Sequence, residues 1–115
     1  MPAGIYNITA EQGATLSRTI TWKNSTGNPI NLSGYTARMQ VRADYESAAS
    51  LLTLTTENGG ITLGGALGTI VITASATATA ALSAGSYVYD LELVLSDVVT
   101  RLVQGAFAVN AEVTR

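Results

Sequence analysis

The chain has 115 residues, an apolar fraction of 47% and a charged fraction of only 12%, against about 25% charged residues in an ordinary soluble domain. This length predicts one domain over residues 1–115, with a core large enough to fold without metals or disulfides. The net charge of −2, with one lysine, argues against nucleic-acid binding, which needs clustered Lys or Arg.

The N-terminal part combines a short apolar segment with one strongly patterned strand. Residues 1–12 are expected to form an N-terminal arm or an edge strand, and they lack the basic and apolar regions of a signal peptide. Residues 14–23 alternate between polar and apolar positions and predict a strand. Arg18 falls on the apolar face of that strand. A buried, unpaired guanidinium is costly, so we expect Arg18 either at the sheet margin with a carboxylate partner or turned outward by a bulge.

The next segments predict a loop, a strand and a crossover. Residues 24–29 are rich in turn formers and are expected to form a loop. Residues 35–42 alternate again and carry Arg38 and Arg42 on their polar face. Residues 43–50 lose the alternation, which favours a crossover over a helix.

The middle of the chain is rich in glycine and threonine. Residues 51–56 predict a strand, and Asn58 followed by Gly59 is a strong hairpin signal. The glycines of residues 57–68 precede another strand at residues 69–73, whereas a phosphate-binding loop precedes a helix. A nucleotide site is therefore rejected, and residues 74–81 predict either a thin strand or one helical turn with Leu82 as its anchor.

Residues 87–95 predict the central strand of the domain. Successive side chains of a strand point to opposite faces, so one face is an apolar wall made of Tyr87, Tyr89, Leu91, Leu93 and Leu95. The opposite face carries Val88, Asp90, Glu92 and Val94. Structural ion pairs are expected between the two acidic residues, Asp90 and Glu92, and the arginines Arg38 and Arg42.

Residues 98–110 predict a long last strand that is apolar on both faces. Val99, Val103, Phe107 and Val109 share one face, and Gly105 marks a bulge or a close crossing. This surplus of apolar surface suggests a protein interface, formed by the other face of the strand and by the N-terminal segment. The expected interface residues are Ile5, Tyr6, Ile8, Val98, Leu102, Ala106 and Ala108. Residues 112–115 are expected to continue as a further strand.

These elements predict an all-β fold. Seven to nine short strands, roughly one turn signal every 8 to 12 residues and at most one or two helical turns are typical of an antiparallel Ig-like β-sandwich. The corner at Gly85 resembles the tyrosine corner of such sandwiches, with Tyr87 or Tyr89 as its tyrosine. The Cys-Trp-Cys core of immunoglobulin domains is missing.

The residue types offer little catalytic chemistry. The chain has no histidine and no cysteine, hence no common general base and no thiolate. Asp90 and Glu92 lie about 6 to 7 Å apart on one strand face, a spacing that resembles a glycosidase pair, but neighbouring arginines would keep both ionised. We expect no enzyme, no cofactor and no metal site. A carbohydrate-binding module is the alternative from another class, with Tyr6 and Tyr45 as the two aromatic residues that alternation does not assign to the core.

Three stretches carry a family resemblance: WKNSTGNPINLSGYTARMQVR at residues 22–42, GSYVYDLEL at residues 85–93 and VTR at the C-terminus. With them the chain resembles small β-sandwich structural proteins of tailed bacteriophages and prophages, and its layout is similar to the N-terminal domain of baseplate upper proteins. The resemblance implies a virion protein of the tail, baseplate or fibre network that binds other virion proteins and copies of itself. A capsid decoration protein is the alternative. From the charge and the hydropathy pattern we expect no nucleic-acid and no membrane partner, and we expect no small-molecule substrate. The resemblance implies a location in virions assembled in the bacterial cytoplasm.

Overall fold

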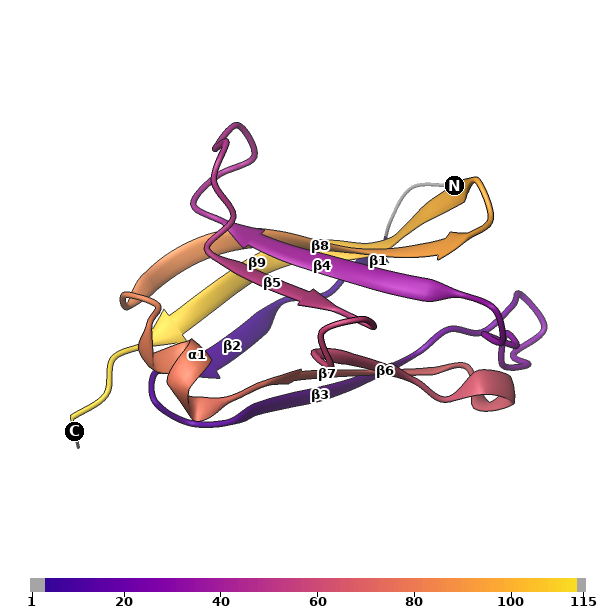
Figure 1. The fold of residues 1–115 in the computed structure, drawn as a ribbon, viewed down its shortest axis with the longest axis horizontal. Helices are drawn as coiled ribbons and strands as arrows, with labels where there is room; N and C mark the ends of the chain where they lie inside the picture. The colour runs from indigo at the N-terminus through magenta and orange to yellow at the C-terminus, as the bar shows by residue number, and fades with distance from the viewer. Residues whose placement is uncertain (1–3, 114–115) are drawn as a thin grey trace.

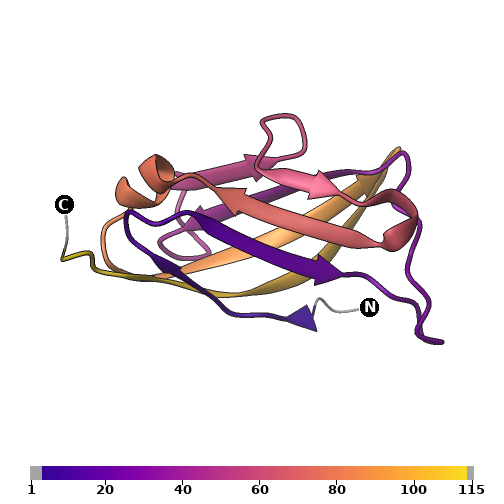
Figure 2. The ribbon, with the colours of Figure 1, turned by 90° about the horizontal axis from the view of Figure 1, so that it is seen from below.

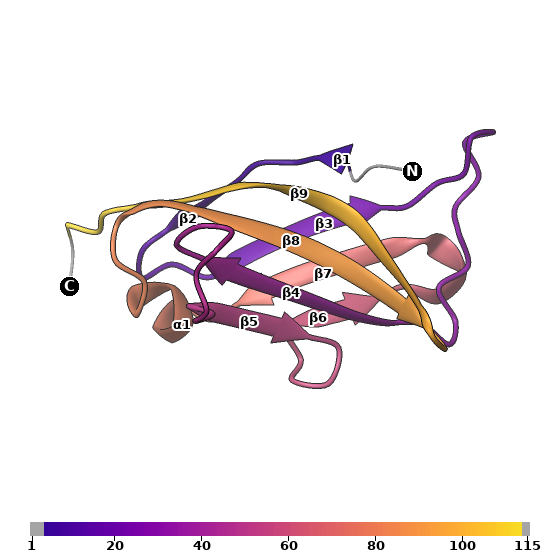
Figure 3. The same cartoon turned by 90° about the horizontal axis from the view of Figure 1, so that it is seen from above.

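The computed structural model describes residues 4–113, which form a sandwich of two β-sheets (Figure 1). The larger, six-stranded sheet contains β1 (Gly4–Ile5), β2 (Ile8–Glu11), β9 (Val98–Asn110), β8 (Gly85–Leu95), β4 (Thr36–Arg42) and β5 (Leu52–Thr55). The smaller sheet contains β3 (Leu16–Thr21), β7 (Thr69–Ala74) and β6 (Ile61–Leu63). Figures 2 and 3 show the two sheets face to face from opposite sides. The expected all-β sandwich is therefore confirmed.

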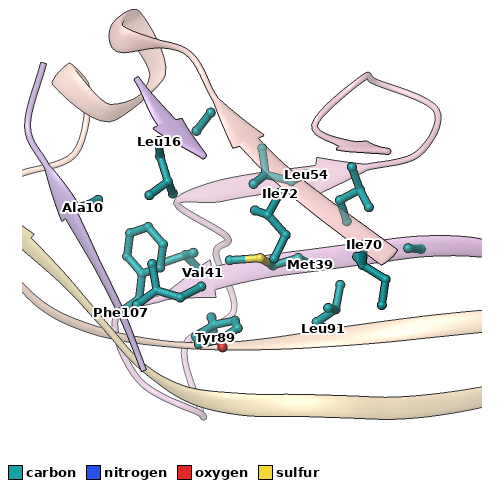
Figure 4. Close-up of a cluster of buried hydrophobic side chains, with 14 of the residues drawn as sticks. Ala10, Leu16, Met39, Val41, Leu54, Ile70, Ile72, Tyr89, Leu91 and Phe107 are labelled. Atoms are coloured by element: carbon teal, nitrogen blue, oxygen red, sulfur yellow. The ribbon is translucent and has the colours of Figure 1, made fainter. Parts of the chain in front are cut away.

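The core lies between the sheets and is built by the predicted alternation. Along β8 the side chains of Tyr89, Leu91 and Leu93 are buried, whereas those of the intervening residues are partly exposed. The Tyr89 ring meets the ring of Phe107 from β9 edge to face, with centroids 6.3 Å apart (Figure 4). Such pairs contribute about 0.5 to 1.5 kcal/mol beyond area burial. Ile70 and Ile72 of β7 cover this wall from the other sheet.

Three connections join successive strands. Residues 43–50 contain no helix, as expected, but they join the antiparallel neighbours β4 and β5 and so form a hairpin loop and not the expected crossover. The 3₁₀ turn η1 (Gly65–Leu67) joins β6 to β7. The single turn α1 (Ala76–Ala80) follows β7, and the Ser75 side chain caps it by accepting a hydrogen bond from the Ala78 N–H at 3.1 Å. Leu82 anchors the end of this turn in the core.

The described part of the N-terminal segment, from Gly4 onward, forms the edge strands β1 and β2, and residues 1–3 of the expected arm lie outside the described residues. Both β1 and β2 pair with β9 in parallel, so the sandwich is not antiparallel throughout. Ile8 lies opposite Phe107 and is 1% exposed. The expectation that Ile8 belongs to an interface is thus wrong, because strand pairing carries its side chain into the core.

Gly105 marks the close crossing that its position in β9 suggested. A Cβ at this residue would lie 2.7 Å from the Tyr6 carbonyl oxygen and 2.6 Å from Asn7 Oδ1. The Asn7 side chain accepts a hydrogen bond from the Ala106 N–H at 3.0 Å, and the Tyr89 hydroxyl donates to the Tyr6 carbonyl. The chain between β1 and β2 passes so close to Gly105 that this position has no room for a side chain.

The bulge in β9 lies elsewhere, at Leu102. Leu91 of β8 is opposite Val103, but the next residue, Glu92, is opposite Arg101. Leu102 is the extra residue, and such an insertion reverses the faces of the residues beyond it. Val99 therefore points to the opposite face of β9 from Phe107, although strict alternation placed both residues on one face.

Tyr87 forms the tyrosine corner, since its hydroxyl donates to the Ser83 carbonyl four residues upstream.

Two expectations about turns and strands are corrected. The turn at Asn58 and Gly59 joins β5 of one sheet to β6 of the other, and so is not a hairpin. Residues 111–113 form no strand, and residues 114–115 of the expected last strand lie outside the described residues.

Candidate functional site

The outer face of the large sheet presents a cross-strand row of alternating charge. Glu92 of β8 lies opposite Arg38 of β4 on one side and opposite Arg101 of β9 on the other. Arg38 Nε donates to Glu92 Oε1 at 2.7 Å, and Arg101 Nη2 lies 3.9 Å from Glu92 Oε2. Both arginine side chains are 54% exposed. Water and salt screen such pairs, so each contributes at most about 1 kcal/mol.

Asp90 lies in the neighbouring row, between two glutamines. It is opposite Gln40 of β4 and Gln104 of β9, and its Oδ2 lies 3.3 Å from Arg101 Nε. Partial burial raises the pKa of Asp90 above its ordinary value, and the charge of Glu92 raises it further. The nearby arginines, Arg101 first, oppose this rise.

Arg42 does not form the ion pair with a carboxylate that the sequence predicts. Its Nη1 donates to the Ser47 carbonyl at 2.7 Å and its Nη2 donates to Gln40 Oε1 at 2.7 Å. Arg42 therefore ties the loop of residues 43–50 to the sheet. Arg101, which the sequence did not single out, takes the position on Asp90 and Glu92 because the bulge at Leu102 turns it outward.

Two adjoining recesses lie on this face. One has a volume of about 250 Å³ and is lined by Gln40, Arg42, Tyr45, Val88, Tyr89, Asp90 and Glu92. The other has a volume of about 310 Å³ and is lined by Arg38, Met39, Gln40, Asp90 and Glu92. The two recesses share Gln40, Asp90 and Glu92. We call the polar surface that they form together the outer groove, defined by Arg38, Gln40, Arg42, Tyr45, Asp90 and Glu92.

The two tyrosines considered for carbohydrate binding have different environments. Tyr45, in the loop that Arg42 holds, is 71% exposed beside the groove. Tyr6 is half-buried and packs against the core. Only Tyr45 therefore presents an exposed ring beside polar groups.

The expected interface residues do not form one surface, because the bulge at Leu102 places Val98 and Ala106 on opposite faces of β9. Ile5 is 71% exposed on β1 and Val98 is 66% exposed on β9, and Ala106 is also exposed. Tyr6, Leu102 and Ala108 are half-buried, and Ile8 is buried.

The alternation pattern did not predict the exposure of two further apolar residues near Val98. Val99 is 48% exposed because the bulge at Leu102 turns it outward, and Leu95, expected in the core wall, is 39% exposed where it lies opposite Val98. We call Ile5, Leu95, Val98 and Val99 the apolar edge set.

Residues 4–113 contain no group of three or more acidic, histidine or cysteine side chains arranged to hold a metal ion. Among the same residues there is no helix long and apolar enough to cross a bilayer. No known protein-family model matches the chain, and no curated protein is significantly similar to it in sequence.

Proposed function

We propose that the chain is a non-enzymatic structural module of a tailed-phage virion, which joins other virion proteins and copies of itself in the tail, baseplate or fibre network. The observation that carries the proposal is the exposure of the apolar edge set, four large aliphatic side chains, with Ile5 on the edge strand β1 and the other three at the tip of the β8–β9 hairpin. Single exposed apolar residues are normal on a protein surface. Four on neighbouring strands of a chain with 12% charged residues favour a protein contact.

The backbone at this edge also suits assembly. β1 is the outermost strand on its side of the large sheet within residues 4–113. The outward N–H and C=O groups of an edge strand can pair with a strand of another chain. Next to it, Arg18 Nη2 donates to the Thr9 carbonyl of β2 at 2.8 Å and so occupies one acceptor of that strand. The part of the edge formed by β1 is therefore better suited to strand addition than the part formed by β2.

The test is incorporation into particles. Ile5→Glu and Val98→Glu are expected to lower both self-association at high concentration and the amount of chain found in purified particles by mass spectrometry. Leu67→Glu is the matched control, since Leu67 is 68% exposed on η1, next to the smaller sheet. A chain that stays monomeric at high concentration and is missing from particles would refute the proposal.

Copy number separates the two places in the virion. A capsid decoration protein covers the shell and occurs in many more copies per particle than a tail or baseplate adaptor. Quantitative mass spectrometry against the major capsid protein measures this ratio, and a ratio near that of the capsid protein would favour decoration.

A further inference from the structure

The outer groove combines an exposed aromatic ring with a loop that is hydrogen-bonded to the sheet. Tyr45 is 71% exposed, and the bond from Arg42 to the Ser47 carbonyl joins its loop to β4. Within the loop the Glu46 N–H donates to Asp44 Oδ1 at 3.1 Å. A tyrosine ring offers a large apolar face at a small cost in conformational entropy. An exposed ring on such a loop is suited to stack on a flat, partly apolar ligand.

The floor of the groove supplies hydrogen-bonding groups of both kinds. Asp90 and Glu92 are acceptors, and an ionised carboxylate has about four lone-pair sites, more than the ion pairs with Arg38 and Arg101 occupy. Arg42 and Gln40 provide N–H donors. A ligand with several hydroxyl groups can both donate to and accept from this set.

The balance of charge indicates what kind of hydroxylated ligand fits. The groove is lined by two arginines, Arg38 and Arg42, and by two carboxylates, Asp90 and Glu92. The charges of these four residues cancel, and Arg101, which is paired with both carboxylates, adds a single positive charge beside the groove. The groove therefore has no strong excess of one sign to attract a phosphate, a sulfate or a polyamine. A neutral ligand meets no repulsion there.

The environment of Asp90 and the size of the recesses agree with ligand binding. The raised pKa of Asp90 arises first from its removal from water, so part of the desolvation cost of covering this carboxylate is already incurred on folding. The recesses, about 250 and 310 Å³, lie just below and at the lower limit of the range of ligand pockets, roughly 300 to 1,000 Å³. One or two small rings would fill them.

We propose that the outer groove binds a neutral oligosaccharide, with the ring of Tyr45 stacked on one sugar and with Asp90, Gln40 and Arg42 hydrogen-bonded to its hydroxyls. This site is separate from the apolar edge set, so its occupancy does not depend on the assembly function proposed above. The same chain can join a particle through its edge and contact a glycan through its outer sheet face.

The test is a printed array of neutral and acidic bacterial and animal oligosaccharides, followed by titration of the best neutral binder with ¹⁵N-labelled protein. Chemical-shift changes are expected at Gln40, Tyr45 and Asp90. Tyr45→Ala is expected to weaken binding roughly tenfold, as loss of an aromatic stack does, and Asp90→Asn several-fold. Tyr45→Phe keeps the stacking face and is expected to stay within about threefold of the native affinity. Leu67→Ala, on η1 next to the smaller sheet, is expected to change nothing.

Three results would each overturn the proposal. One is an array without any signal. Another is binding confined to sulfated or carboxylated glycans, which would indicate an ionic surface. The third is neutral-glycan binding that survives both Tyr45→Ala and Asp90→Asn, since the sugar would then lie elsewhere. A negative glycan result with normal incorporation into particles would leave the assembly proposal standing.

Discussion

Arg18 Nη2 donates a 2.8 Å hydrogen bond to the Thr9 carbonyl oxygen, and this bond joins β3 of the smaller sheet to β2 of the larger one. The Nη1 of the same guanidinium donates to the Ser17 carbonyl at 3.0 Å. Arg18 thus lies at the sheet margin, as one of the two expectations had it, but backbone carbonyls take the place of a carboxylate. β3 needs no bulge, because the end of the guanidinium reaches past the apolar face to the facing edge strand.

Removing the hydrogen bond between Arg18 and Thr9 should weaken the contact between β3 and β2. Arg18→Ala is expected to lower the free energy of unfolding by about 1 kcal/mol, since hydrogen bonds to charged groups contribute about 1.5 to 3 kcal/mol and this one is exposed. Urea denaturation measures the loss. Lys23→Ala, an exposed cation just beyond β3, is the control and should stay within about 0.5 kcal/mol of the native chain. Equal effects of the two substitutions would contradict a specific role for Arg18.

The crossing at Gly105 predicts a sharp difference between two strand glycines. Gly105→Ala would put a methyl group 2.7 Å from the Tyr6 carbonyl oxygen and 2.6 Å from Asn7 Oδ1. The backbone has to move, at a cost of roughly 1 to 3 kcal/mol. Gly4→Ala on β1 meets nothing closer than 3.7 Å and should be tolerated. Thermal unfolding of both variants checks this, and a stable Gly105→Ala chain would mean that the crossing is looser than described.

The contribution of the tyrosine corner to stability can be measured by removing the hydroxyl oxygen of Tyr87. Tyr87→Phe removes the hydrogen bond to the Ser83 carbonyl and leaves the ring in place. The expected loss is about 0.5 to 1.5 kcal/mol, the usual contribution of one neutral hydrogen bond. Tyr45→Phe, at an exposed loop residue, serves as the control and should be neutral. An unfolding midpoint unchanged in Tyr87→Phe would argue that the corner has no role in stability.

Asp90 should make stability depend on pH in a direction unusual for a carboxylate. Folding raises its pKa, so the folded chain holds this proton more tightly than the unfolded chain. The contribution of Asp90 to stability is therefore full below its unfolded pKa, about 3.9, and is lost as the pH rises through the folded value. Relative to the native chain, Asp90→Asn should become more stable as the pH increases from 3 to 7. Urea titrations of both chains across this range measure the difference, and a difference that shrinks with pH would contradict the direction.

Arg101 should limit how far the pKa of Asp90 rises on folding. Its Nε lies 3.3 Å from Asp90 Oδ2, and its positive charge is the largest influence that lowers this pKa. Arg101→Ala should therefore raise the pKa of Asp90 further, which an NMR titration of the Asp90 carboxyl carbon would detect. Arg42→Ala should raise it less, because the guanidinium of Arg42 is hydrogen-bonded to Ser47 and Gln40. A larger effect from Arg42 would reverse the assignment of partners.

The sequence by itself determined the properties that depend on neighbouring residues. Period-two alternation identified the core face of β8 at Tyr89, Leu91 and Leu93, and turn formers marked where most strands end. The exposure of Tyr45 also followed from its place in a segment without alternation. These features are local, because a strand assigns each side chain to a face whatever strand lies beside it.

Only the tertiary structure decided which strands pair and in what register. One extra residue at Leu102 turned Arg101 and Val99 outward, and parallel pairing with β9 buried Ile8 against Phe107. The partner of Arg18 came from a strand of the other sheet. Register reflects the packing of residues far apart in the chain, and a shift of one residue reverses every face beyond it, so alternation within one strand does not contain this information.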